Sequence, residues 1–122
     1  MSKRRVLLAD DDPGLRRLIG ATLGAESFEI LSADDGEEAL TVARRERPAL
    51  ILLDINMPRQ NGLDVCRQLK SDPETAGIKI VMLTASGAEL DRRRASEAAA
   101  DDYVVKPFSP IALLDKVYAL LS

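Results

Sequence analysis

Histidine is absent from the 122-residue chain, and cysteine occurs once, as Cys66. The absence of histidine excludes imidazole-based acid–base catalysis and histidine-ligated metals, so carboxylates remain as the candidate metal ligands. A single cysteine excludes an intramolecular disulfide and fits a reducing cytosol. Because carboxylate oxygens favour hard cations, Mg²⁺ is the metal that this composition allows most readily.

The sequence also lacks an apolar stretch long enough to span a bilayer. The basic residues within 1–5 are not followed by the apolar run and cleavage site of a signal peptide. With 17 basic and 20 acidic residues the net charge is -3, which gives no electrostatic reason to bind nucleic acid or an anionic membrane. We therefore expect a cytoplasmic protein in which these residues bind neither nucleic acid nor a membrane.

Short apolar runs alternate with longer segments of helical spacing. The runs cover residues 6–9, 28–31, 50–53, 80–83 and 103–105. Three of them are nearly continuous in apolar residues, as strands buried on both faces are. Five strands that alternate with five helices predict an α/β fold, a doubly wound (βα)5 three-layer sandwich around a five-stranded parallel sheet. The length predicts one domain, residues 1–122, whose last helix ends at residue 122 with no effector domain after it.

Three helix starts are marked by capping residues. Asp12 precedes Pro13, and Ser109 precedes Pro110, so each pair places an N-cap before a proline at the first helical position. Asp35 lies three residues before Glu38, as in a capping box.

Polar side chains follow four of the five apolar runs. They are Asp10, Asp11 and Asp12 after the first run, Asp54 after the third, Thr84 after the fourth and Lys106 after the fifth. Ligands of open α/β sheets bind at the carboxyl ends of the strands, so these side chains are expected to meet at one edge.

The chemistry of this set points to phosphoryl transfer. Carboxylates held together repel one another and cannot all stay ionised without a cation, which favours a divalent ion. Asp54 beside a lysine and a threonine can act as the nucleophile toward a phosphoryl group. Mg²⁺ and Lys106 would stabilise charge on the phosphoryl oxygens, and the hydroxyl of Thr84 would donate a hydrogen bond to one of them.

Four stretches make a family resemblance specific: residues 6–12, residues 52–58 followed by Asn61 and Gly62, residues 81–85, and residues 101–108. In this order and spacing the chain resembles a response regulator receiver domain of two-component signalling, similar to the chemotaxis response regulator. The resemblance covers essentially all residues. It implies a flavodoxin-like sheet of order 2-1-3-4-5, which periodicity alone does not determine, and a signalling domain rather than an enzyme.

The resemblance also implies residue roles and partners. Asp54 is the phosphoacceptor. Mg²⁺ is bound by Asp11, Asp54 and the backbone carbonyl of Asn56, with Asp10 acting through water. Thr84 and Lys106 contact the phosphoryl oxygens, and Tyr103 is an aromatic switch. The phosphoryl donor is a sensor histidine kinase or a histidine phosphotransfer protein. The face of helix four, strand five and helix five is expected to contact a downstream protein or effector domain, in a monomer or a phosphorylation-dependent dimer. Asn56 and Ser86 tune dephosphorylation, and the Lys106-Pro107 bond is a candidate cis bond.

The sequence departs from the family pattern before the last strand. The family often has a glycine there, whereas this chain has alanine at 98, 99 and 100, so a left-handed helix end would be strained. The fourth helix is also poor in large apolar residues and relies on Leu90 and alanines.

Two other functions remain open at this point. A haloacid-dehalogenase-type phosphatase would carry a second aspartate two residues after the nucleophile, where this chain has Asn56. A receiver-like interaction module that is never phosphorylated would lack some of the acidic residues or the lysine, which this chain keeps. Single residues also have simpler interpretations: Asp12 as a helix cap, Cys66 as a small core residue, and the arginines at 92–94 as a solvated face.

Overall fold

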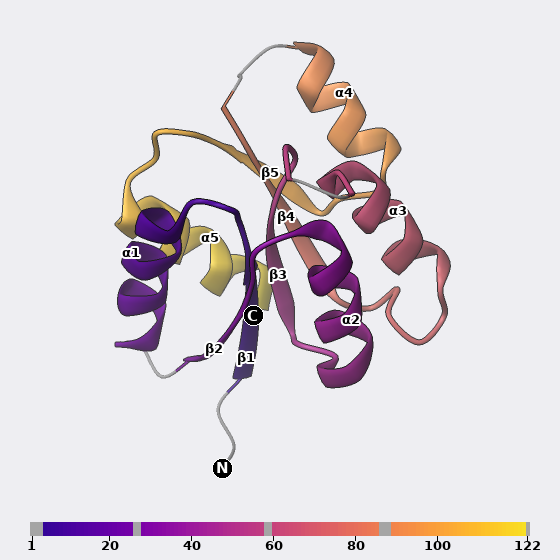
Figure 1. Cartoon of the computed structure of the whole chain (residues 1–122). Coiled ribbons are helices and arrows are strands. Elements are labelled where there is room, and N and C mark those ends of the chain that lie inside the picture. The colour runs from indigo at the N-terminus through magenta and orange to yellow at the C-terminus, as the bar shows by residue number, and fades with distance from the viewer. Residues whose placement is uncertain (1–3, 26–27, 58–59, 86–88, 122) are drawn as a thin grey trace.

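The computed structural model describes residues 4–25, 28–57, 60–85 and 89–121, and at 89–91 the backbone alone. Strands and helices alternate along the described chain (Figure 1). The strands are β1 (Arg4–Ala9), β2 (Phe28–Ala33), β3 (Leu50–Asp54), β4 (Lys79–Thr84) and β5 (Asp102–Val105). The helices are α1 (Pro13–Gly24), α2 (Gly36–Glu46), α3 (Gly62–Ser71), α4 (Glu89–Glu97) and α5 (Pro110–Leu121).

The strands form one parallel sheet of order β2-β1-β3-β4-β5. This order confirms the predicted fold class and strand order. Helices α1 and α5 cover one face of the sheet, and α2, α3 and α4 cover the other (Figure 1). In the described part of the chain, no helix is long and apolar enough to cross a membrane.

The central strands are buried on both faces, as their continuous apolar runs predicted. Leu7 and Ile51 point into the cluster under α2, α3 and α4, whereas Leu8 and Leu52 point into the cluster under α1 and α5. All four side chains have no exposed surface. Because alternate residues of a strand face opposite sides, each strand supplies both cores. Full burial of each such side chain stabilises the fold by about 1.5–3 kcal/mol.

The predicted helix caps are present. Asp12 Oδ1 accepts hydrogen bonds from the backbone N–H groups of Gly14 and Leu15 at the start of α1. Asp35 Oδ1 accepts from the N–H of Glu38, and the Ser109 hydroxyl oxygen accepts from the N–H of Ala112. The caps matter for the site because α1 begins directly after the aspartates that follow β1.

The end of α4 shows the strain that the missing glycine predicted. Ala99 has a φ of 67°, in the left-handed region that favours glycine. The N–H of Ala99 donates to Ser96 O and the N–H of Ala100 donates to Ala95 O, which is the hydrogen-bond pattern of a Schellman helix end. Of the residues on which this helix was expected to rely, the alanines at 95 and 98 are buried, and the side chain of Leu90 lies outside the described residues.

Two further expectations are also met. The Lys106-Pro107 bond is cis. Cys66 is fully buried in the same cluster as Leu63 and Leu69 on α3, and its thiol donates to the carbonyl of Ala98 at 3.3 Å. The cysteine is therefore a small core residue that links α3 to the end of α4.

Candidate phosphoacceptor site

The strand register brings the predicted side chains to one edge of the sheet. β1 ends at Ala9, which pairs with Leu53 of β3, so Asp10 and Asp54 follow neighbouring positions. Asp54 pairs with Leu83 of β4, and Thr84 pairs with Val105 of β5. Lys106 directly follows the end of β5. Parallel strands thus deliver three charged residues and a hydroxyl to the same edge.

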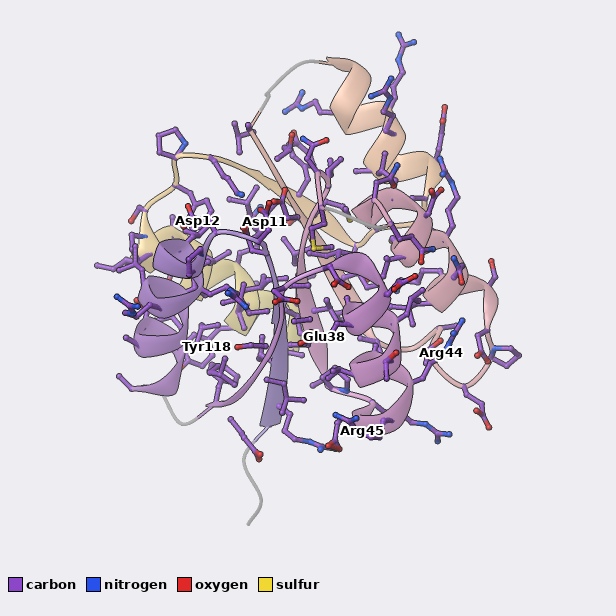
Figure 2. The ribbon with its side chains drawn as sticks, in the orientation of Figure 1. Asp11, Asp12, Glu38, Arg44, Arg45 and Tyr118 are labelled. Atoms are coloured by element: carbon purple, nitrogen blue, oxygen red, sulfur yellow. The ribbon has the colours of Figure 1, made fainter. Side chains whose placement is uncertain are left out.

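Three carboxylates form the acidic part of the site. One oxygen of each of Asp10, Asp11 and Asp54 lies within 4.8 Å of the others. Asp10 has no exposed surface and Asp54 is 5% exposed, whereas Asp11 is exposed. Figure 2 shows Asp11 and Asp12 at the end of β1, where the chain turns into α1. Two buried carboxylates and one accessible carboxylate therefore face a common point.

Lys106 is the cation of this group. Its Nζ lies 2.8 Å from Oδ2 of Asp10 and 3.4 Å from Oδ2 of Asp54. The Lys106 side chain is 24% exposed, so the ammonium sits at the rim of the buried pair. One ammonium faces three carboxylates, which leaves an excess of negative charge at the site.

The electrostatics of Asp54 follow from burial and from this excess. Burial raises the pKa of Asp54, and the charge of Asp10 raises it further. Lys106 and a hydrogen bond from the N–H of Asn56 act in the opposite direction without cancelling the effect. Burial alone would lower the pKa of Lys106, but the hydrogen bond to Asp10 and the charges of Asp54 and Asp10 leave it raised. The lysine therefore stays charged, while the carboxylates of Asp10 and Asp54 repel each other.

Backbone donors orient both buried carboxylates. The N–H of Asp12 donates to Asp10 Oδ1 at 2.9 Å, and the N–H of Asn56 donates to Asp54 Oδ1 at 3.2 Å. In each pair the donor lies two residues after the acceptor, so a local turn fixes the carboxylate. Oδ2 of both residues faces Lys106, which leaves the site with a fixed orientation before any ligand arrives.

Gly62 supports the loop after Asp54, a role that the sequence did not suggest. A Cβ at Gly62 would lie 2.1 Å from the backbone oxygen of Asp54, so no larger residue fits there without a shift of the backbone. The N–H of Gly62 donates to Ile55 O at 2.8 Å. The sequence placed Asn61 and Gly62 only in the second family motif, and the close approach was visible only once the fold was assembled.

Two of the remaining predicted residues, Thr84 and Tyr103, lie on β4 and β5. Thr84 is 2% exposed at the end of β4, and its carbonyl accepts from the N–H of Lys106 at 2.7 Å. Tyr103 lies on β5, partly buried, with its ring under the guanidinium of Arg92. Ser86, which was expected to tune dephosphorylation, lies outside the described residues, as does Pro58 of the second motif.

A groove of about 500 Å³ opens beside Lys106. Its walls are mostly apolar and come from α1 and from the segment after β5: Asp12, Leu15, Leu18, Ala85, Lys106, Pro107 and Phe108. Leu18 is 49% exposed, which is high for a leucine. The groove therefore borders the edge of the site at Lys106 and Asp12.

The family of the chain follows from the comparisons with known proteins. The model of the response regulator receiver domain matches residues 6–118. The chain belongs to the response regulator receiver family. It is therefore a receiver domain of two-component signalling, and the phosphatase alternative is set aside.

Curated relatives agree with this assignment. The DNA-binding response regulator MtrA of Mycolicibacterium smegmatis is 44% identical over 119 residues, which are 98% of this chain and 51% of MtrA. The probable transcriptional regulator ycf27 of Cyanophora paradoxa is 42% identical over 121 residues, which are 99% of this chain and 49% of ycf27. The chain thus spans about half the length of the curated relatives that it matches.

Solved receiver structures superpose closely. The chemotaxis response regulator CheY4 of Vibrio cholerae has a TM-score of 0.92 at 29% identity, over 98% of this chain and 99% of CheY4. The receiver domain of the sensor histidine kinase PA1611 from Pseudomonas aeruginosa PAO1 has a TM-score of 0.90 at 27% identity, over 98% of each chain. In that structure a magnesium ion is coordinated in the active site cleft.

Proposed function

We propose that residues 1–122 form one phosphoacceptor domain in which Asp54 accepts a phosphoryl group. The observation that carries the proposal is the position of Lys106, whose ammonium lies between the buried carboxylates of Asp10 and Asp54. A strand-end carboxylate paired with a lysine, in a member of the receiver family, supports the formation of an aspartyl phosphate at Asp54. The phosphoryl donor is a sensor histidine kinase or a histidine phosphotransfer protein.

The donor set fits a magnesium ion. Three carboxylate oxygens within 4.8 Å of one another supply hard ligands, and their charge exceeds that of the one lysine beside them. Asp11, Asp54 and the backbone carbonyl of Asn56 would hold the ion, with Asp10 acting through water. When bound, Mg²⁺ offsets negative charge on the phosphoryl oxygens and on the carboxylates.

The transfer step uses the residues at the strand ends. A bond forms between an Asp54 carboxylate oxygen and phosphorus while the bond from phosphorus to the donor's histidine nitrogen breaks, and that nitrogen keeps the electron pair. Lys106 turns from Asp10 toward a phosphoryl oxygen, and the Thr84 hydroxyl donates a hydrogen bond to another. Water later attacks the aspartyl phosphate and releases inorganic phosphate, at a rate that Asn56 and Ser86 influence.

The output is a population shift rather than a catalysed reaction on a separate substrate. Phosphorylation draws Thr84 toward the site, and the Tyr103 ring turns inward on the same face of the sheet. The surface of α4, β5 and α5 then presents a different shape to a downstream protein or effector domain, as a monomer or a phosphorylation-dependent dimer. We place this signalling in the cytoplasm, because a reducing compartment keeps the thiol of Cys66 reduced.

Intact-mass measurement tests the acceptor assignment. The wild-type chain, incubated with Mg²⁺ and acetyl phosphate, should gain the mass of one phosphoryl group, and the gain should require Mg²⁺. Asp54→Asn keeps the shape of the side chain but removes the nucleophilic oxygen, so it should gain nothing. Equal labelling of the two proteins would refute the role of Asp54. A wild type that is never labelled and does not bind beryllofluoride would indicate an interaction module without phosphoryl chemistry.

A further inference from the structure

An arginine of α4 lies over the aromatic ring of Tyr103. Cζ of Arg92 is 5.2 Å from the centroid of the ring, which is within the range of cation–π attraction. Arg92 is exposed and Tyr103 is partly buried, so the contact forms at the surface between α4 and β5. It connects the helix of the expected output surface to the residue expected to move.

Tyr103 lines a groove beside α4. The groove has a volume of about 230 Å³ and is lined by Arg92, Ala95, Ser96, Ala100, Asp101, Asp102 and Tyr103. The ring also packs against the core cluster under α2, α3 and α4. One side of the tyrosine therefore contacts the core, and the guanidinium of Arg92 covers another.

Tyr103 and Thr84 lie on the same face of the sheet. Tyr103 pairs with Met82 of β4, and Val105 pairs with Thr84. Residues two apart on a strand share a face, so the two pairs form adjacent rows on the side that α4 covers. A shift of Thr84 toward Asp54 would open space in the row next to the ring. Movement of the ring into that space would take it away from Arg92.

We propose that Arg92 is a positioning residue that holds Tyr103 in its resting orientation, so that phosphorylation must break this contact before the ring turns inward. The inference rests on the proposed function of Asp54 and adds a residue that opposes the switch. A ligand shifts a two-state equilibrium only through contacts that differ between the two states. The Arg92–Tyr103 contact exists in the resting state, so its loss should favour the phosphorylated conformation.

A simpler interpretation is that Arg92 belongs to a solvated basic face with its neighbours. Arg93 provides the matched control, since it is exposed on the same helix and carries the same charge. Arg92→Ala and Arg93→Ala remove one positive charge each, but the described ring contact belongs to Arg92. Arg92→Lys keeps the charge and loses the planar guanidinium that lies over the ring.

The chain allows Tyr103 to be observed alone. It contains no tryptophan and two tyrosines, so a Tyr118→Phe background leaves Tyr103 as the only strong emitter. Phenylalanine at 118 keeps the ring that packs against Phe28 at a centroid distance of 5.5 Å. In this background we would titrate beryllofluoride, a phosphoryl analogue, in the presence of Mg²⁺ and follow the emission of Tyr103.

Arg92→Ala should lower the half-saturating beryllofluoride concentration about two- to fivefold, the factor that a surface cation–π contact supplies. Arg92→Lys should give a smaller shift of the same sign, and Arg93→Ala should match the parent protein. Without beryllofluoride, Arg92→Ala alone should change the emission of Tyr103.

Three results would overturn the inference: equal shifts in Arg92→Ala and Arg93→Ala, no shift in Arg92→Ala, or weaker binding in Arg92→Ala. Each leaves the proposed function intact if the parent protein responds to beryllofluoride and Asp54→Asn does not. A parent protein without an emission response would overturn the role of Arg92, and it would overturn the proposed function as well if intact-mass measurement also found no phosphoryl gain. If Arg92→Ala does not fold, the Arg92→Lys titration decides by the same criterion.

Discussion

The ammonium of Lys106 lies 2.8 Å from Oδ2 of Asp10, a carboxylate with no exposed surface. The two residues are 96 positions apart in the chain, and their pairing ties the segment after β5 to the end of β1. Oδ2 of Asp54 lies 3.4 Å from the same ammonium. The resting site is therefore held together by a lysine that the proposed transfer step must take away from Asp10.

Lys106→Gln should lower the free energy of unfolding by about 1–3 kcal/mol in metal-free buffer. Glutamine has a similar volume, but it leaves the buried carboxylate of Asp10 without a counter-charge and close to Asp54. The expected loss is smaller than for a fully buried pair because the lysine is 24% exposed. Urea unfolding in the presence of a chelator measures the difference.

Lys116→Gln is the control for that measurement. Lys116 Nζ lies 2.9 Å from Asp102 Oδ2, a similar separation, but both side chains are about one-third exposed. A surface pair of this kind contributes about 0–1 kcal/mol. Equal losses in the two variants would mean that the burial of Asp10 has no influence on the strength of the lysine contact.

Asp11→Asn should weaken Mg²⁺ binding about tenfold or more, and at least as much as Asp10→Asn. The oxygens of Asp10 already accept from the N–H of Asp12 and from Lys106, whereas the exposed carboxylate of Asp11 can turn toward an ion. Calorimetric titration with Mg²⁺ gives the two affinities directly.

A second acidic group provides the control for the metal titration. Asp34, Asp35 and Glu38 also bring three carboxylate oxygens within 4.8 Å of one another, near the start of α2. Asp35 already caps that helix. Glu38→Gln should leave the Mg²⁺ affinity unchanged. A larger effect at Glu38 than at Asp11 would place the ion in the group that follows β2, away from Asp54, and would contradict the proposed ligand set.

Cys66 should make the wild type lose stability above pH 9 faster than Cys66→Ala. Burial raises the pKa of the thiol from 9.0 to about 11. The folded state thus holds the thiol proton more tightly than the unfolded state does. The contribution of the protonated thiol to the free energy of unfolding is fully present below pH 9 and disappears as the pH rises through 11. By pH 11 the difference between the proteins should have changed by about 2 kcal/mol.

Urea unfolding of both proteins across this pH range measures the effect of Cys66. The cavity left by alanine lowers stability by the same amount at every pH, so only the slope against pH is informative. Lysines and tyrosines titrate in both proteins and cancel in the comparison. Parallel pH curves would show that the thiol ionises as easily in the folded chain as in the unfolded one.

The sequence predicted the elements that depend on local pattern. Continuous apolar runs predicted the buried strands, and Asp12 and Asp35 predicted the helix starts. The ends of the predicted strands indicated the positions of Asp54 and Thr84. Each of these signals is contained within a few neighbouring residues. Parallel topology alone then predicts that the side chains at the strand ends meet at one edge of the sheet.

Contacts between distant elements were not predictable in the same way. The choice of Asp10 as the nearer partner of Lys106, the approach of Gly62 to the backbone of Asp54, and the ring contact of Arg92 all depend on how finished elements pack. An exposed arginine in a basic run has the same local sequence whether or not an aromatic ring lies under it. Its role becomes visible only in the assembled fold.

Ala99→Gly should stabilise the protein by about 1 kcal/mol. Ala99 holds a φ of 67° at the left-handed position of the Schellman motif that ends α4. Glycine adopts this conformation without a Cβ clash, and the gain is partly offset by the greater freedom of glycine in the unfolded chain. Thermal and urea unfolding of the two proteins measure the net effect.

Ala100→Gly is the matched control, because Ala100 follows in the same segment and is not among the described residues with a positive φ. There glycine adds freedom to the unfolded chain and removes a methyl group that packs against the core, so the variant should lose at least about 0.5–1 kcal/mol. Opposite signs at adjacent alanines would show that the strain lies at one residue. If Ala99→Gly were destabilising as well, the helix end would carry no strain that glycine relieves. The departure from the glycine usual in the family would then have no energetic consequence here.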